Sequence, residues 1–367
     1  MNWAILRLYC DEAGTEEWGY YNSQELGLAR ALAAKGIPVT IVYPERNRKN
    51  QQLEEENGIS ILRIPCRVLG THAFYKLDFL QKRNIDVVHL NSDNQMFAPG
   101  VMKFCRKHHI FFYNYVGTLY SDTDNFVKKV LMNIISARNI RFYRKNIVVA
   151  KTISVEQTLR KKGVSGIETI HVGLDVTQIR REEREQGELR KELGLPEGKK
   201  LLLFVGRLEQ YKRPFAALEL LKKLGERYHL VLVGTGSLRE QIEEKACRDK
   251  LDNQISYLGR IPNTLMYQYY SACDYYVNFN THEIFGMSIL EAMYQECTVV
   301  ARRAPGPEEI IENGISGHLC GSEEEMAAVI QEGEERKTGR EAGIRISEHF
   351  TWEKSAEQFL TLVRDRR

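Results

Sequence analysis

Short β-rich runs alternate with stretches of helical periodicity along almost the whole chain, and this order limits the possible folds more than any other feature. In the first half the strand-like runs are 3–9, 38–43, 59–64, 86–90 and 110–115, and the helix-like stretches are 23–35, 73–83 and 97–107. Strands joined through helices run parallel, and parallel sheets need cover on both faces. The sequence therefore predicts an α/β fold with parallel sheets.

The alternation occurs twice. Charged residues rich in Glu and Arg dominate 178–200, which is typical of a linker with a short helix. The strands then expected are 200–205, 229–233, 255–258, 275–279 and 298–301, and the helices are 214–224, 238–249, 286–295 and 309–312. Because 367 residues are many for one core, we expect two Rossmann-like domains, 1–176 and 177–350. An amphipathic helix at 351–367 could pack on either domain, including back on the first.

Composition narrows the class of protein further. No apolar run approaches the length that a bilayer requires, and residues 1–11 have the pattern of a first strand rather than of a signal peptide. The seven cysteines are scattered and none is in a CxxC pair, so we expect neither disulfides nor zinc, and a reducing cytoplasm. A net charge of +3 is too small to indicate a nucleic-acid partner.

The most informative stretch is 282–293, which reads HEIFGMSILEAM. We expect Gly286 to open a helix whose apolar positions face the core. The N–H groups of Gly286, Met287 and Ser288 would then have no acceptor inside the helix, and the helix dipole adds positive potential at the same end. This arrangement predicts a phosphate site at the helix start.

Two glutamates flank this predicted phosphate site. Glu283 precedes it and Glu291 lies further along the helix. Carboxylates repel phosphate, but they accept hydrogen bonds from sugar and ribose hydroxyls, which a nucleotide sugar presents on both sides of its diphosphate. The alternative is that both glutamates are simply solvated, which their spacing alone would favour. The intervening Phe285-Gly-Met-Ser makes the site interpretation more specific.

A second constellation lies at 204–214, which reads FVGRLEQYKRP. It combines a strand end, a turn at Gly206, two cations five residues apart, and a proline at a helix start. Arg207 and Lys212 on one strand-to-helix loop could neutralise a diphosphate, the arginine as a bidentate donor and the lysine as a point charge. The alternative is a solvated basic loop.

Together these motifs resemble the signatures E-x-F-G-x-x-x-x-E-A-M and G-R-x-x-x-x-K of retaining glycosyltransferases of family 4 (glycosyl transferases group 1). The resemblance covers most of residues 200–320 well and 1–176 loosely. It implies the GT-B fold, in which two Rossmann-like domains with parallel sheets face a cleft. The donor would bind the C-terminal domain, and the acceptor would enter from the N-terminal domain.

The resemblance also implies roles for the motif residues. Glu283 would contact the transferred sugar and Glu291 the ribose, while Phe285–Ser288 would hold sugar and phosphate through their backbones. Arg207 and Lys212 would stabilise the departing diphosphate, where charge develops during the reaction.

Weaker matches extend the predicted site. Gly206 belongs to the turn before the two cations, and Arg260 and Ile261 match the region that borders the nucleotide base, although a packed strand end is the alternative there. In the first half, Gly19 matches a loop glycine that touches phosphate and acceptor. Many relatives carry a histidine after the strand at 110–115, and in its absence Asn114 is the predicted sugar contact.

Two metal-like patterns are assigned other functions. Asp122 and Asp124 form a DxD sequence just before a long predicted helix, so capping that helix is the simpler interpretation. His108 and His109 are adjacent, and their side chains would diverge at a helix end. We therefore expect no metal and no cofactor.

The long helix predicted at 126–145 contains six lysines and arginines. Its basic face could hold the protein on an anionic membrane beside a lipid-linked acceptor. An ordinary solvated helix is the alternative. The expected location is the cytoplasm, with peripheral contact at the inner face of the membrane.

These observations predict a retaining, metal-independent hexosyltransferase that moves a hexose from a nucleotide diphosphate sugar to a sugar or lipid-linked acceptor. Cell-surface polysaccharide or glycoconjugate synthesis is the expected setting, with UDP as the first expectation for the nucleotide and GDP as the second. Two alternatives remain open. One is a sugar-nucleotide epimerase of the same fold, and the other is an inactive nucleotide-binding protein.

Overall fold

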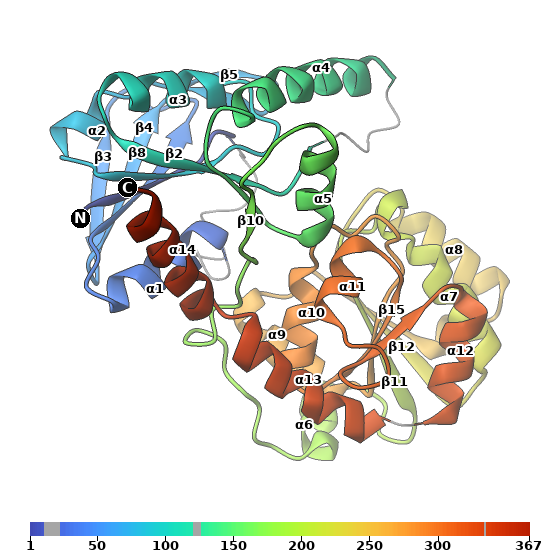
Figure 1. Ribbon diagram of the computed structural model, residues 1–367. Coiled ribbons are helices and arrows are strands. Elements are labelled where there is room, and N and C mark those ends of the chain that lie inside the picture. The colour runs from blue at the N-terminus through green and yellow to red at the C-terminus, as the bar shows by residue number, and fades with distance from the viewer. Residues whose placement is uncertain (11–22, 120–125, 334) are drawn as a thin grey trace. The chain divides into compact units, whose positions relative to one another are not determined.

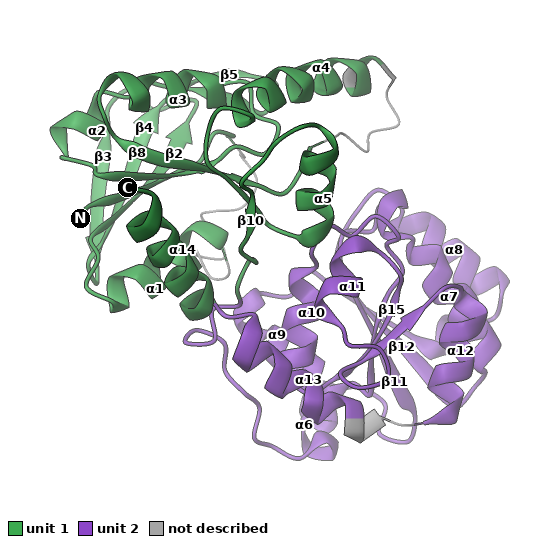
Figure 2. Cartoon of the chain, in the orientation of Figure 1, with its two compact units in different colours: residues 1–173, 352–367 green, residues 174–351 purple. Residues whose placement is uncertain are grey.

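The computed structural model describes residues 1–10, 23–119, 126–333 and 335–367. The chain forms two compact units (Figure 2). Unit 1 comprises Met1–Gly173 together with Trp352–Arg367, and unit 2 comprises Leu174–Thr351. Each unit has its own sheet of mainly parallel strands covered by helices, as Figure 1 shows.

Unit 1 contains an eight-stranded sheet of order β10-β9-β8-β7-β1-β2-β4-β3. Its strands are β1 (Trp3–Leu6), β2 (Val39–Glu45), β3 (Gln52–Glu56), β4 (Ile59–Pro65), β7 (Val87–Asn91), β8 (Phe111–Val116), β9 (Val148–Ala150) and β10 (Glu168–Thr169). Every neighbouring pair is parallel except β3 and β4, which are antiparallel. Strands β5 (Arg67–Leu69) and β6 (His72–Phe74) form a separate antiparallel pair.

The helices described in unit 1 are α1 (Gln24–Ala34), α2 (Phe79–Lys82), α3 (Ala98–Lys107), α4 (Phe126–Tyr143), α5 (Ile153–Lys161) and α14 (Trp352–Arg366). Helix α14, the last helix of the chain, packs beside α1 in unit 1. The Phe359 ring stacks on Tyr113 with centroids 5.2 Å apart. A Cβ at Gly27 would lie 2.1 Å from the Trp352 indole, so α1 needs glycine there.

Unit 2 contains a six-stranded sheet of order β13-β12-β11-β14-β15-β16, in which every pair is parallel. Its strands are β11 (Lys200–Val205), β12 (Tyr228–Val233), β13 (Ile255–Gly259), β14 (Tyr275–Asn278), β15 (Thr298–Arg302) and β16 (His318–Cys320). Its helices are α6 (Gln186–Glu192), α7 (Pro214–Leu224), α8 (Arg239–Arg248), α9 (Asn263–Ala272), α10 (Met287–Tyr294), α11 (Pro305–Ile310), α12 (Glu323–Glu332) and α13 (Glu335–His349), with short 3-10 turns at Gln210–Lys212 and Asp252–Gln254.

The central strands of both sheets are buried on both faces, which explains their near-continuous apolar sequences. Residues 201–203 of β11 and 230–232 of β12 are fully buried. Covered parallel sheets require such runs rather than an alternating pattern.

The prediction of a single helix over 73–83 is wrong for its first half. Residues 72–74 form β6, and only Phe79–Lys82 are helical. The Ala73 N–H donates to the Leu8 carbonyl at 2.8 Å, and the Tyr75 hydroxyl donates to the Arg7 carbonyl at 2.9 Å. Contacts with the chain that leaves β1 therefore override the local helical periodicity.

Candidate functional site

The strand order of unit 2 defines where a ligand would bind. From β11 the chain continues to β12 on one side and later returns to β14 on the other side of β11. In open parallel sheets, ligands bind at the carboxyl edge where the strand order reverses. Because β11 and β14 are hydrogen-bonded neighbours, the loops 206–213 and 279–286 leave the sheet side by side. These loops carry the two motifs found in the sequence.

An ion pair joins the two loops. The Lys212 Nζ lies 2.6 Å from the Glu283 Oε2, although the residues are 71 positions apart. Both side chains are mostly but not fully buried, at 20% and 15% exposed. The Asn280 amide also donates to the Glu283 Oε2, at 3.1 Å. The structure therefore brings together the cation loop and the acidic residue, as the motifs predicted.

Gly286 forms the start of helix α10. It has a φ of 105°, which L side chains rarely adopt, and a Cβ here would lie 2.9 Å from the Ile289 side chain and 3.4 Å from the Glu283 side chain. Glycine is therefore required both by conformation and by space. The next amides, of Met287 and Ser288, belong to the first helical turn, where no intrahelical acceptor is available.

A second glycine supports this loop from behind. The Gly306 N–H donates to the Glu283 carbonyl at 2.8 Å, and a Cβ at Gly306 would lie 2.2 Å from the Phe285 carbonyl oxygen. The backbone before α10 therefore rests directly on the start of α11. This contact fixes the position of Glu283 through its main chain.

Arg207 is exposed beside an aromatic ring. Its Nε donates to the Tyr211 hydroxyl at 2.8 Å, and its guanidinium carbon lies 5.3 Å from the centre of the Tyr211 ring. The Lys212 Nζ lies 5.5 Å from the same ring. Tyr211 thus contacts both cations of the loop. Sequence reasoning missed this residue, although its place between the two cations was visible.

Glycines in the turn after β12 allow the cation loop to pack closely. A Cβ at Gly234 would lie 1.8 Å from the Gly206 carbonyl oxygen, and one at Gly236 would lie 2.4 Å from the Leu208 carbonyl oxygen. The Glu209 carboxylate accepts hydrogen bonds from the Ser237 N–H at 2.9 Å and from its hydroxyl at 2.8 Å. The Gly-Thr-Gly turn therefore forms the wall behind Gly206.

The other motif glutamate, Glu291, lies on α10 and is partly buried. The Tyr270 hydroxyl of α9 donates to it at 2.8 Å. Burial raises the pKa of the Glu291 carboxyl from 4.5 to about 7, and the hydrogen bond from Tyr270 opposes part of this rise. One turn earlier, the Ser288 hydroxyl lies 2.7 Å from the Tyr276 hydroxyl. Ser288 and Glu291 of α10 are thus each oriented by a tyrosine.

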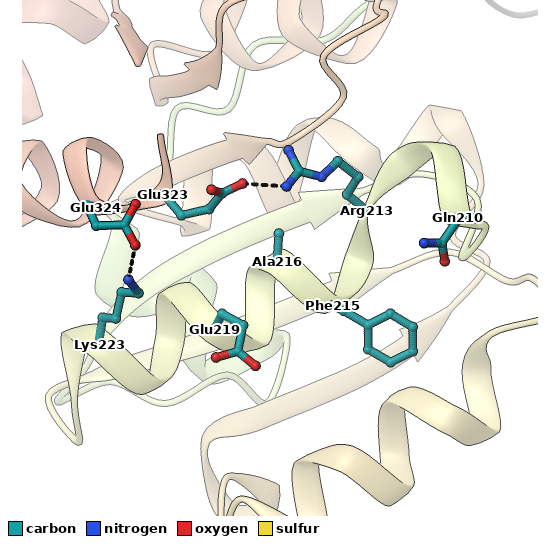
Figure 3. Close-up of a pocket in the computed structure, with 8 residues that line it drawn as sticks. All are labelled: Gln210, Arg213, Phe215, Ala216, Glu219, Lys223, Glu323 and Glu324. Carbon is teal, nitrogen blue, oxygen red and sulfur yellow. Dashed lines mark hydrogen bonds and ion pairs between the residues drawn. The ribbon is translucent and has the colours of Figure 1, made fainter. Parts of the chain in front are cut away.

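Arg213 links the two loops from the opposite side. Its φ is 54°, which is uncommon for a residue with a side chain. Its guanidinium lies 3.5 Å from the Phe279 carbonyl, at the start of the second loop, and 2.9 Å from the Glu323 carboxylate of α12. Figure 3 shows this pair and the neighbouring Lys223–Glu324 pair in a groove between α7 and α12. The cations of this groove are therefore already neutralised.

Other predicted residues lie further away or outside the described chain. Arg260 and Ile261 follow β13, which is separated from β11 by β12. Gly19 lies outside the described residues. Asn114 is fully buried within β8, where its Nδ2 donates to the Ile147 carbonyl at 3.0 Å. The structure assigns Asn114 this backbone contact and does not expose it to a sugar.

The two sequence patterns that resemble metal sites, the DxD sequence and the adjacent histidines, are in separate parts of the chain. Asp122 and Asp124 fall outside the described residues. His108 Nδ1 lies 2.9 Å from the Gln81 amide, and His109 has a φ of 54° just after α3. Within residues 1–10, 23–119, 126–333 and 335–367, no group of three histidines, cysteines or acids is arranged to hold a metal ion.

Helix α4 in unit 1 carries an exposed apolar stripe that the sequence interpretation missed. Its members are Val127, Val130, Leu131 and Ile134, which are between 41% and 67% exposed. Their spacing places them on one face of the helix, and Arg141, seven residues beyond Ile134, extends the same face with a positive charge. As for spanning a bilayer, none of the described helices combines the length and the apolar character that crossing would need.

Comparisons with known proteins agree with this geometry. The family described as glycosyl transferases group 1 matches residues 185–348, and glycosyltransferase family 4 matches residues 26–178. An uncharacterised glycosyltransferase of Methanocaldococcus jannaschii is 23% identical over 79% of this chain and 78% of its own length. The human alpha-1,3/1,6-mannosyltransferase ALG2 is 29% identical, but the match spans only 46% of each chain.

Solved structures show the same fold. Sucrose-phosphate synthase from Thermosynechococcus elongatus superimposes with a TM-score of 0.79 at 19% identity, over 99% of this chain and 98% of its own. HepE of Anabaena in complex with UDP-glucose has a TM-score of 0.75 at 18% identity over the full length of both chains. The two family matches together span most of the sequence, and both sheets are of the expected parallel type. The chain belongs to glycosyltransferase family 4 and has the GT-B fold.

Proposed function

We propose that this protein is a retaining hexosyltransferase that uses a nucleotide diphosphate sugar, with UDP as the first candidate for the nucleotide. The observation that carries the proposal is the Lys212–Glu283 pair beside Gly286, at the reversal point of the unit 2 sheet. Positive charge, free helix amides and a hydroxyl acceptor meet there. A nucleotide sugar carries a negatively charged diphosphate between the hydroxyls of its sugar and those of its ribose, and these are the groups that such a site can bind.

The chemistry follows from these groups. The diphosphate would bind the amides at the start of α10, with Lys212 and Arg207 neutralising its oxygens. Glu283, released from Lys212, would accept a hydrogen bond from a hydroxyl of the transferred sugar. Because Lys212 is paired with a carboxylate in the free protein, it is held near the site without being buried as a lone charge.

We infer a front-face substitution. The bond between the anomeric carbon and the diphosphate oxygen breaks, and the acceptor oxygen bonds to the anomeric carbon on the same face. The acceptor proton passes to the departing diphosphate, so no protein nucleophile is required. Lys212 and Arg207 stabilise the charge that develops on the leaving group. Because these cations supply the charge compensation, we propose that turnover needs no metal and persists in EDTA.

Donor identity can be tested by thermal shift with UDP, GDP, ADP and their sugars. A ligand that binds only the folded protein at 100 times its Kd adds about 2.7 kcal/mol, which raises the Tm by several degrees. We expect the largest shift with UDP or UDP-glucose, in keeping with the UDP-glucose bound to the structurally similar HepE. A larger shift with GDP would identify GDP rather than UDP as the preferred nucleotide and would still support the proposed donor site. No shift with any nucleotide would contradict the proposed donor site.

Product analysis separates the proposed reaction from its alternatives. Incubated with donor alone, a glycosyltransferase is expected to hydrolyse the sugar slowly or leave it unchanged until an acceptor is added. Conversion of the donor to an epimer would identify an epimerase. Tight binding of the donor with no turnover under any condition would indicate a protein that only binds nucleotide.

We also propose that the acceptor is a sugar or a lipid-linked molecule reached at the inner face of a membrane, in glycoconjugate synthesis. The stripe on α4 supports this because apolar side chains and Arg141 share one helix face, which suits an anionic interface. One sequence relative is named alpha-monoglucosyldiacylglycerol synthase, at 28% identity over 44% of this chain.

Membrane contact can be measured by co-sedimentation with phosphatidylglycerol vesicles. We expect Leu131→Gln/Ile134→Gln to bind at least about fivefold more weakly, because burying these side chains in lipid supplies part of the affinity. Ile344→Gln, at an exposed aliphatic position of unit 2, is the control and should bind as the wild type does. Absence of wild-type binding at low salt would end the membrane proposal.

A further inference from the structure

A pocket in unit 1 lies at the carboxyl edge of the large sheet and shares no lining residue with the candidate site of unit 2. It has a volume of about 550 Å³, within the range of small-molecule sites. Its lining includes residues 64–67, which run from the end of β4 to the start of β5, and residues 74–76, which run from the end of β6 into the chain that follows. Strands β1, β2 and β4 are parallel, so their carboxyl ends all reach this edge.

The pocket is firmly attached to the central strand. After β1 the chain pairs with the β5–β6 hairpin, through Ala73 N–H to the Leu8 carbonyl and through Cys10 N–H to the Thr71 carbonyl at 3.0 Å. The Tyr75 hydroxyl adds the contact to Arg7 described above. The residues that line the pocket are therefore held on a fixed framework.

Two cations stand at this pocket. Arg67 and Lys76 both line it, and both side chains are exposed. Neither forms an ion pair with a carboxylate among the residues that the structure describes. This differs from the groove in Figure 3, where glutamates neutralise both Arg213 and Lys223.

Two acids close to the pocket residues are already engaged: the Cys66 N–H donates to the Glu45 carbonyl at 3.2 Å, and Asp78 lies two residues after Lys76. Glu45, at the end of β2, pairs with Arg48 at 2.5 Å and with Arg63 at 2.8 Å. Asp78 pairs with Lys82 at 2.6 Å, and this hydrogen bond is the main reason that the pKa of Asp78 is lowered. The described residues that line the pocket therefore carry two positive charges and no carboxylate, and an anion could neutralise them.

The remaining lining suits a polyol or a sugar ring. Phe74 is partly exposed, and its ring lies 5.5 Å from Phe97, which also contacts Tyr75 at 5.4 Å. These packed rings give the pocket a rigid apolar wall, which can contact the C–H groups of a sugar. The exposed Gln51 amide can both donate to and accept from hydroxyls.

From these observations we propose that the unit 1 pocket binds the anionic group of the acceptor, and that the acceptor is a phosphorylated or carboxylated sugar or polyol. This inference rests on the proposed glycosyl transfer, because it assigns the substrate class of that reaction. Arg67 and Lys76 are the binding residues. Arginine forms bidentate hydrogen bonds with phosphate or carboxylate, and lysine adds a point charge.

The proposal is tested by calorimetric titration of the full-length protein, saturated with UDP, with glucose 6-phosphate, glucuronate and glucose. We expect the two anions to bind at least about fivefold more tightly than glucose. Arg67→Gln/Lys76→Gln should lose this preference. The control Lys107→Gln/Lys161→Gln removes the same charge from other exposed positions of unit 1 and should retain it.

Further measurements separate this inference from the donor site and from lipid binding. UDP binding is measured on the same variants and should be unchanged, so failure of the donor site would be recognised independently. Anionic binding confined to phosphatidylglycerol vesicles and lost in Arg67→Gln/Lys76→Gln would identify a lipid headgroup as the source of the anion. Equal binding of glucose and glucose 6-phosphate, or an unaltered double variant, would overturn the proposal.

Discussion

Lys212→Ala is expected to lower turnover at saturating donor by roughly 10²-fold or more, and Arg207→Ala by a similar factor. In the proposed reaction both cations face the leaving diphosphate, so their effect is greatest when its charge develops. Lys212 also holds Glu283 at 2.6 Å, so its loss should disturb the sugar contact as well. The measurement is the release of nucleotide in the presence of acceptor.

Stability provides the control for this prediction. Both side chains reach solvent, and the packing of the cation loop depends on Gly234 and Gly236 rather than on either cation. We therefore expect both variants to remain folded, with a Tm close to that of the wild type. Arg227→Ala, which removes an exposed arginine just before β12, should leave turnover unchanged. Near-normal turnover in both Lys212→Ala and Arg207→Ala would refute their assignment.

The candidate site could be predicted largely from sequence because its parts are local motifs. A glycine at a helix start and two cations at a fixed spacing are each local features, and each predicts the conformation of a segment of about ten residues. The approach of Lys212 to Glu283 depends on the adjacency of β11 and β14, which no local spacing specifies. Family resemblance supplied that step. The contacts of Tyr211 and Arg213 were not predicted, because they depend on side-chain positions within a turn.

Unit 1 shows where local patterns fail. Residues 72–74 have apolar spacing suited to a helix, but hydrogen bonds to the chain after β1 make them a strand. Strand β3 reads Gln-Leu-Glu-Glu-Glu and is almost entirely exposed, so it has no apolar alternation to detect. In α4, the abundance of basic residues concealed the apolar stripe. For residues 72–74 and for β3, tertiary pairing rather than local propensity decided the structure.

Glu291 gives the second large expected effect, a donor affinity that depends on pH. We propose that its ionised carboxylate accepts the ribose hydroxyls. Because burial raises its pKa to about 7, the carboxyl must lose a proton before or during binding. For a single group of this pKa, the Kd for UDP-glucose should be about tenfold weaker at pH 6 than at pH 8. UDP-glucose is the suitable ligand, because its diphosphate does not titrate in this range.

Two variants isolate this carboxyl. Glu291→Gln should bind UDP-glucose about 10- to 100-fold more weakly at pH 8, since hydrogen bonds to a charged acceptor are worth about 1.5–3 kcal/mol. It should also lose the pH dependence. Tyr270→Phe removes the hydrogen bond that favours the carboxylate, so the midpoint should move to higher pH. A pH dependence retained in Glu291→Gln would contradict the assignment.

The raised pKa of Glu291 also predicts that the stability of the fold decreases with rising pH, whereas the affinity for the donor increases. A carboxyl whose pKa rises on folding costs nothing below its unfolded value of 4.5 and destabilises the fold as pH rises through about 7. Glu291→Gln should therefore be more stable than the wild type above pH 7, by about 1–2 kcal/mol given partial solvent access, and the difference should vanish below about pH 4.5. Urea unfolding at pH 4.5 and pH 8 measures this difference. A Glu291→Gln variant that binds the donor poorly but unfolds at a higher urea concentration than the wild type would show that Glu291 serves ligand binding rather than stability.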